Sequence, residues 1–276
     1  MTDAAEAPGT FSRRAAIKAM SASAAFASLS DAWCATASAQ QAAASASLPR
    51  SLTLVAAPGT RMLKPTPSAA TAIWGMSVLG MAVPDPGMQA PAPAIRMKQG
   101  DTIKVRLENK TPKPLSLHWH GVRHANAMDG VGGVTQASAA PGGSTDYVLT
   151  PPDSGSFIYR PMVLGGAGEA QERGLAGMLV VEEREPPQVD NDIVLVVDDW
   201  LLTPEGQLAP FGEPGTTPEA AAGGRLGNWL TVNGRPIPER TLFAPGARLR
   251  LRLANVSNAR TLRIRFDNLK AHVIAI

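Results

Sequence analysis

Residues 115–128 read LSLHWHGVRHANAM and hold three of the four histidines in this 276-residue chain. His118 and His120 flank Trp119 at the end of an apolar run, just before a glycine. Successive side chains of a β-strand point to opposite faces, so both imidazoles should lie on one face and the indole on the other. Imidazole suits copper, zinc, iron or nickel, but a closed metal site takes three or four ligands. The stretch therefore predicts a strand that carries half of a metal site.

On either side of this stretch the chain consists of short extended runs separated by turns rich in proline and glycine. Residues 101–107, DTIKVRL, alternate polar and apolar side chains, which is typical of a strand with one buried face. Strands are predicted at residues 51–55, 71–78, 102–107, 114–120, 145–149, 156–159 and 175–181. This spacing predicts an all-β fold, with a Greek-key sandwich in the first part of the chain.

The second part begins after residues 182–192, an acidic stretch with two consecutive prolines that predicts a linker. Further strands are predicted at residues 193–200, 228–232, 248–253 and 261–266. Arginine alternates with apolar residues in the last two, and we expect these arginines to form a solvated strand face. The apolar run 271–276 predicts one more strand, with His272 in a structural role. No turn or polar cap follows that run, so we expect the second domain to be incomplete.

Residues 1–39 resemble a targeting peptide. Arg13 and Arg14 lie in a twin-arginine pattern, a weakly apolar Ala/Ser stretch follows, and Ala-Ser-Ala at 37–39 is a small-residue cleavage pattern. The pattern predicts twin-arginine export to a bacterial periplasm or beyond, with no membrane attachment after cleavage. An N-terminal helix or a disordered tail is the alternative.

Composition excludes some other classes. The formal charge is +3 with a pI near 9.2, but the basic residues are interleaved with acids, so we expect no nucleic-acid partner. The single cysteine, Cys34, lies in the predicted leader. It excludes a disulfide framework and a cysteine-ligated metal site made from this chain alone.

A longer series of motifs points to one family. LHWHGVR at 117–123 is followed by MDGV at 128–131, VTQ at 134–136, APG at 140–142, PDSGSF at 152–157, GLAGMLVV at 174–181, VDDW at 197–200, TVNG at 231–234 and PGARLRLRLAN at 245–255. Together these resemble the first and middle cupredoxin domains of multicopper oxidases, the laccase-like enzymes. The resemblance implies tandem cupredoxin-like Greek-key sandwiches at residues 50–183 and 190–276, the second one truncated before a third domain.

The resemblance also implies a chemistry. In the family a type 1 copper takes electrons from a small-molecule or metal-ion reductant and passes them to a three-copper cluster that reduces dioxygen to water. By motif position His118 would be a type 2 ligand and His120 a type 3 ligand. Copper is therefore the implied cofactor, with a reductant and dioxygen as the partners of an active enzyme.

The sequence departs from the family where a second His-x-His is expected. GSFIYRPM at 155–162 places Arg160 and Met162 at those two positions. A guanidinium has no lone pair to donate, so Arg160 cannot ligate copper. Met162 could bind Cu(I) or simply fill space in the core. We expect only a partial copper site, and no type 1 site, in this chain.

Other candidate ligands are few. His124 could join the pair or be a solvated surface histidine, and Asp129 could ligate or cap a turn. Two functions remain open. One is a copper-dependent oxidoreductase of the laccase type whose copper site is incomplete in this chain, and the other is a non-catalytic cupredoxin-like periplasmic module that binds copper weakly or serves as a scaffold.

Overall fold

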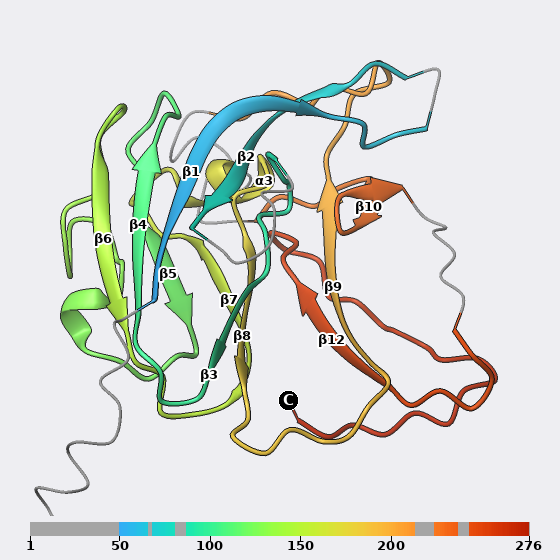
Figure 1. Ribbon diagram of the computed structural model, residues 1–276. Helices are drawn as coiled ribbons and strands as arrows, with labels where there is room; N and C mark the ends of the chain where they lie inside the picture. The colour runs from blue at the N-terminus through green and yellow to red at the C-terminus, as the bar shows by residue number, and fades with distance from the viewer. Residues whose placement is uncertain (1–49, 66–67, 81–86, 213–223, 237–242, 276) are drawn as a thin grey trace, which may run out of the picture. The chain divides into compact units, whose positions relative to one another are not determined.

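The computed structural model describes residues 50–65, 68–80, 87–212, 224–236 and 243–275 (Figure 1). The predicted export signal, with Arg13 and Arg14, lies outside the described residues. No helix in the described part of the chain is long and apolar enough to cross a membrane. The described residues are nearly all strand and loop, which confirms the all-β prediction.

Two four-stranded sheets are built from the first part of the chain. The first has the order β2-β1-β4-β6 and the second the order β3-β8-β7-β5. Their strands are β1 (Arg50–Arg61), β2 (Thr71–Leu79), β3 (Ile95–Lys98), β4 (Ile103–Asn109), β5 (Leu117–His120), β6 (Ser144–Leu149), β7 (Gly155–Pro161) and β8 (Gly177–Glu182). The 3-10 turn η1 (Asn126–Met128) and the short helix α3 (Ala167–Glu172) lie in the connections.

A third four-stranded sheet, with the order β11-β10-β9-β12, follows the predicted linker. It consists of β9 (Asn191–Trp200), β10 (Trp229–Val232), β11 (Arg235–Pro236) and β12 (Leu249–Asn255). β12 runs parallel to β9 and forms one edge of this sheet, as Figure 1 shows. A tight turn at Asn233-Gly234 joins β10 to β11, and both residues have positive φ.

The main core lies between the first two sheets. Ile103, Val105 and Leu107 of β4 are buried, as their alternation predicts. Trp119 packs edge-on against Tyr147, with ring centroids 5.4 Å apart, and lies 5.7 Å from Tyr159. These aromatic contacts anchor β5 and β7 from the inside.

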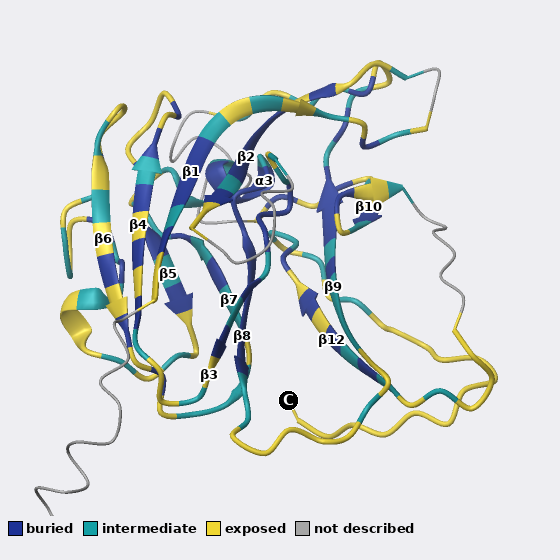
Figure 2. Cartoon of the chain, in the orientation of Figure 1, coloured by how far each residue is buried: buried dark blue, intermediate teal, exposed yellow. Residues whose placement is uncertain are grey.

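A second apolar cluster covers part of the outer face of the β3-β8-β7-β5 sheet. It consists of Ala176, Met178, Val180, Val196, Ala254 and Val256, with Ile158 and Val194 packed against it. β8 is therefore buried on both faces along most of its length (Figure 2). Ile158, which packs against this cluster, is paired with His120 across β5 and β7.

The arginines of β12 contradict the sequence prediction of a solvated face. Arg250 and Arg252 are 9% and 4% exposed, whereas Leu253 is 39% exposed. Arg250 pairs with Glu183, and Arg252 pairs with Asp192 through two hydrogen bonds. These carboxylates lie at the start of β9 and in the segment before it, and they compensate the charges of the buried guanidinium groups. The face of β12 that carries the leucines is therefore the one exposed to solvent.

The strands predicted at 261–266 and 271–276 are not formed in the described residues. Residues 260–275 have no regular secondary structure, and apolar side chains such as Ile264 and Val273 are exposed. His272 is exposed as well, so its predicted place in an apolar strand is wrong. An alternating pattern forms a strand only where another strand offers hydrogen bonds, and no described strand pairs with these residues.

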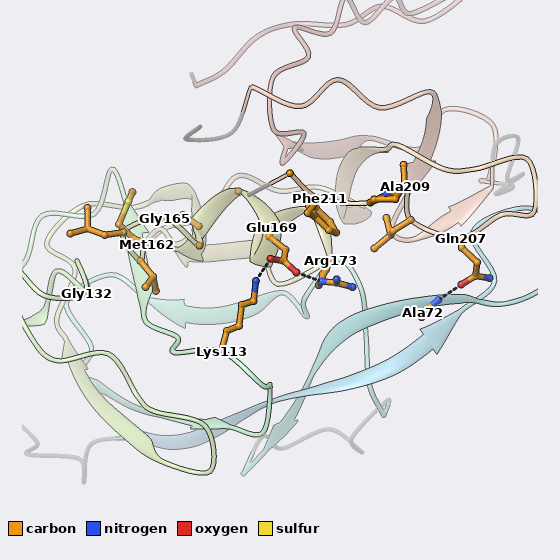
Figure 3. Close-up of a pocket in the computed structure, with 18 of the residues that line it drawn as sticks. Ala72, Lys113, Gly132, Met162, Gly165, Glu169, Arg173, Gln207, Ala209 and Phe211 are labelled. Carbon is orange, nitrogen blue, oxygen red and sulfur yellow. Dashed lines mark hydrogen bonds and ion pairs between the residues drawn. The ribbon is translucent and has the colours of Figure 1, made fainter. Parts of the chain in front are cut away.

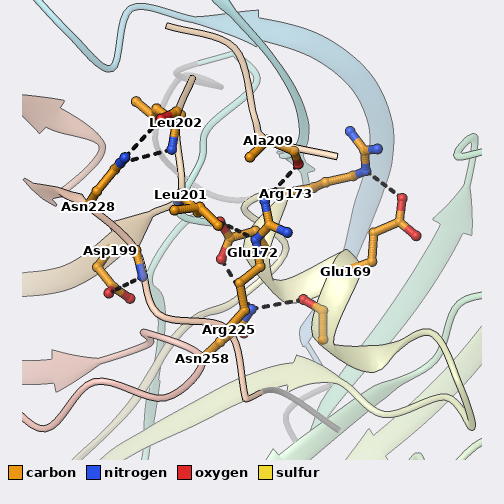
Figure 4. Close-up of polar contacts among 12 residues, drawn as sticks. Glu169, Glu172, Arg173, Asp199, Leu201, Leu202, Ala209, Arg225, Asn228 and Asn258 are labelled. Atoms are coloured by element: carbon orange, nitrogen blue, oxygen red, sulfur yellow. Dashed lines mark hydrogen bonds and ion pairs between the residues drawn. The ribbon is translucent and has the colours of Figure 1, made fainter. Parts of the chain in front are cut away.

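A buried ionic cluster joins α3 to the segments around β9. Glu172 of α3 accepts hydrogen bonds from the Leu201 backbone N–H and from Asn258, and pairs with Arg225 (Figure 4). The side chains of Glu172 and Arg225 are only 1% and 3% exposed. Burial, as the main cause, raises the pKa of Glu172 to about 7, and the nearby Asp199 adds to the rise.

Candidate metal centre

The two histidines lie on one face of β5, as predicted. β5 pairs antiparallel with β7, so that His118 is opposite Arg160 and His120 is opposite Ile158. Trp119 is 1% exposed in the core, whereas the His118 side chain is 17% exposed and His120 is exposed. The two imidazole rings are 5.7 Å apart, with their planes at 90°. Strand alternation thus brings both imidazoles to the same outer face of the sandwich.

The loop after β5 fixes the orientation of His118. Gly121 leaves the strand with φ of 84°, and the loop returns so that the Asp129 backbone carbonyl lies 2.8 Å from His118 Nδ1. A carbonyl oxygen can only accept, so Nδ1 carries the hydrogen and the neutral ring keeps its lone pair on Nε2. Outer hydrogen bonds of this kind orient the metal-binding imidazoles of metal sites in general.

His124 does not lie where a solvated surface histidine would. Its side chain is 4% exposed, and its Nε2 lies 3.5 Å from Asp129 Oδ1. The same carboxylate oxygen lies 3.3 Å from His118 Nδ1. His124 therefore packs behind Asp129. Among the described residues no three or more His, Cys, Asp or Glu side chains are arranged to hold a metal ion.

Arg160 is the charged neighbour of the histidine pair. Its Nε is buried without a hydrogen-bond partner, and the structure gives its side chain no hydrogen bond or ion pair to another described residue. Burial, then the Arg160 charge and then His118 lower the pKa of His120. The lowered pKa favours the neutral imidazole of His120.

Met162 follows β7 and is held through its backbone. The Ser116 hydroxyl donates to the Met162 carbonyl at 2.8 Å, and the Met162 N–H donates to the Ser116 carbonyl at 3.1 Å. Met162 lines a cavity of about 550 Å³ (Figure 3). On another wall Glu169 pairs with Lys113 and Arg173, and these hydrogen bonds hold its pKa below the usual value although burial opposes the shift.

Comparison with known proteins decides the family. Residues 86–186 match the family described as multicopper oxidase. The chain belongs to the multicopper oxidase family. Laccase-1 of Botryotinia fuckeliana is 32% identical over 190 residues, a match that covers 67% of this chain and 33% of the laccase. A multicopper oxidase of Mycobacterium tuberculosis is 33% identical over 203 residues, covering 64% of this chain and 39% of the relative.

Solved multicopper oxidases share the fold. The crystal structure of the enzyme from Pseudomonas thermotolerans superposes with a TM-score of 0.66 at 37% identity, covering 79% of this chain and 49% of that one. A structure of Lac15 from a marine microbial metagenome gives a TM-score of 0.58 at 35% identity, covering 75% and 48%. The chain thus spans half or less of the length of these multicopper oxidases.

Sequence reasoning found the histidine pair of this multicopper oxidase chain but missed what supports it. The contact to His118 Nδ1 comes from a backbone carbonyl, which no side-chain pattern encodes. Glycine permits a close backbone approach, and Gly130 makes one to the Leu117 carbonyl, but the structure and not the sequence shows that glycine is required there. The burial of His124 depends on how the whole loop folds, and no local pattern indicates it.

Proposed function

We propose that this chain is an exported, copper-binding multicopper-oxidase-like protein with an incomplete copper site. The family chemistry is oxidation of a small-molecule or metal-ion reductant with dioxygen reduced to water. One observation carries the proposal: the Asp129 carbonyl holds His118 Nδ1–H, so that the Nε2 lone pair is free on the face shared with His120. When copper is bound, its Cu(I)/Cu(II) couple would supply one-electron transfer.

The donors present suit one copper ion better than a three-copper cluster. His118 and His120, at the type 2 and type 3 positions, each offer one imidazole nitrogen. In this proposal Arg160 and Met162 occupy the positions of the family's second His-x-His, and Arg160 places a permanent positive charge opposite His118. That charge also supports the alternative function, a non-catalytic cupredoxin-like module that binds copper weakly or acts as a scaffold.

Copper loading of the full chain tests this proposal. We expect one tightly bound copper per chain after dialysis, without a blue thiolate band. His118→Ala and His120→Ala should each abolish binding, because one remaining imidazole is too weak a donor set. His272→Ala is the matched control, since His272 is exposed outside any strand. Several tight coppers would contradict an incomplete site, and no copper at all would contradict the site itself.

Oxygen consumption separates the two functions. With a phenolic reductant and with Cu(I), the copper-loaded chain should consume oxygen if it is an oxidase, and the His118→Ala variant should not. Uptake equal in the two proteins would favour the non-catalytic module.

Twin-arginine export is the proposed route to the periplasm. Replacing Arg13 and Arg14 together by lysine should leave the protein in the cytoplasmic fraction of a bacterial host, because the pair is the export signal. Cell fractionation with immunoblotting measures this. Equal periplasmic amounts of the variant and the native protein would rule out this route.

A further inference from the structure

The face that carries the histidine pair combines two opposite chemistries. Imidazole nitrogens with free lone pairs attract a cation, and the Asp129 carbonyl places the lone pair of a neutral His118 ring on Nε2. The guanidinium of Arg160, directly opposite His118, attracts an anion. A cation alone would be repelled by the fixed positive charge of Arg160, and an anion alone would be repelled by the lone pairs of neutral imidazoles.

Arg160 differs from the buried arginines elsewhere in the described residues. Arg225 pairs with Glu172, Arg250 with Glu183 and Arg252 with Asp192. Arg160 has a buried Nε with no partner and no ion pair with a described residue. A partly buried guanidinium normally satisfies its donors with a carboxylate, water or a ligand.

The nearby loop carboxylate is already engaged. Asp129 turns its Oδ1 towards His118 Nδ1 and His124 Nε2, on the side of His118 remote from the lone pair. His120 is exposed and Arg160 is partly exposed, so a small solute can reach this face from solvent.

We propose that Arg160 binds a small planar oxyanion, carbonate or a simple carboxylate, which serves as an additional ligand to a copper ion held by His118 and His120. The guanidinium fork matches two oxygens of such an anion, and a planar oxyanion has further lone pairs for the metal. The anion supplies the missing donor and offsets the Arg160 charge. This inference rests on the proposed copper site and identifies the anion as the third ligand of the copper ion.

The test measures copper affinity of the full chain with and without the anion. Cu(II) binding is determined by chelator competition in bicarbonate-free buffer and in buffers with bicarbonate, acetate or phosphate. We expect at least a tenfold gain in affinity with bicarbonate or acetate and a smaller gain with tetrahedral phosphate. The bicarbonate and acetate arms separate the two sources of the anion. With ¹³C-bicarbonate, the Cu(II) EPR signal should show coupling to ¹³C.

Variants assign the effect to Arg160. Arg160→Gln should lose the dependence on the anion, and should bind copper in anion-free buffer more tightly than the native chain does. Arg123→Gln is the control, because Arg123 is exposed and paired with Asp153. Carbonate also binds copper in solution, but this competition is the same for every protein in a given buffer. The difference between variants therefore reports the protein alone.

Two outcomes overturn the inference and differ in what else they overturn. Copper that binds the native chain equally well in all four buffers, without ¹³C coupling, removes the anion and leaves the copper site standing. Failure to bind copper in any buffer removes both proposals. The native-chain measurements need no variant, so they decide the question even if Arg160→Gln does not fold.

Discussion

Gly130→Ala is expected to destabilise the protein by roughly 3 to 5 kcal/mol, from overpacking together with a left-handed backbone conformation. Gly130 has φ of 73°, and a Cβ at this position would lie 1.7 Å from the Leu117 carbonyl oxygen and 3.2 Å from the His118 N. The clash is with the backbone of β5, so no side-chain rotation can relieve it. Either the loop or the strand must move, and the hydrogen bond from His118 to Asp129 should be lost.

Gly133→Ala is the matched control in the same loop. Gly133 also has positive φ, at 81°, but nothing lies within 4 Å of its added Cβ. The Gly133→Ala substitution should lower the free energy of unfolding by only about 1 kcal/mol, which is the conformational penalty alone. Urea denaturation measures both variants, and NMR of the His118 ring reports the hydrogen bond. Equal losses of stability would show that the close approach of Gly130 to β5 does not matter.

Stability is expected to fall between pH 5 and pH 8, with Glu172 contributing roughly 3 kcal/mol to the change. In the folded protein the pKa of Glu172 is about 7, above its ordinary value of 4.5, mainly because of burial. The fold therefore favours the protonated carboxyl. This contribution is complete below the ordinary value and is lost as pH rises through about 7.

The groups around Glu172 shape this dependence. Arg225 and the Leu201 N–H favour the charged form, whereas Asp199 disfavours it and is itself paired with Arg260. Asp198 lies nearby, and burial, followed by Glu172 and Asp199, raises its pKa well above the usual value. Asp198 therefore also makes the free energy of unfolding fall as pH rises. Part of this effect remains without the Glu172 carboxylate, because burial is its main cause.

Glu172→Gln isolates the Glu172 part. The amide keeps hydrogen-bonding capacity but cannot ionise, so the difference in unfolding free energy between native protein and variant should change by roughly 3 kcal/mol from pH 5 to pH 8. Glu185→Gln, at an exposed position of the predicted linker, is the control and should follow the native profile. Parallel profiles for native protein and Glu172→Gln would refute the assignment.

The sequence predicted those parts of the fold that local patterns encode. The alternation in 101–107 predicted β4 with its buried face, and the His-x-His pattern predicted two imidazoles on one side of β5. Ordered motifs predicted the family. Each of these signals depends on neighbours in the chain, so no knowledge of long-range contacts was needed.

The errors concern partners that are distant in the chain. Alternation shows that arginines and leucines of 248–253 lie on opposite faces, but not which face is buried. That choice depended on Glu183 and Asp192. The same limit explains the strand predicted at 261–266, which lacks a partner among the described strands.

The inward arginines of β12 have a consequence for how this edge strand finds its place. In most half-buried strands apolar side chains set the register, and several registers can bury them almost equally well. Here a shift by one residue would bring Leu251 and Leu253 to the carboxylates in place of the arginines. Glu183 would lose its arginine partner, and Asp192 would keep only Arg96. The alignment of β12 along β9 is thus specified by ion pairing, and it should resist slippage even though the strand lies at the edge of its sheet.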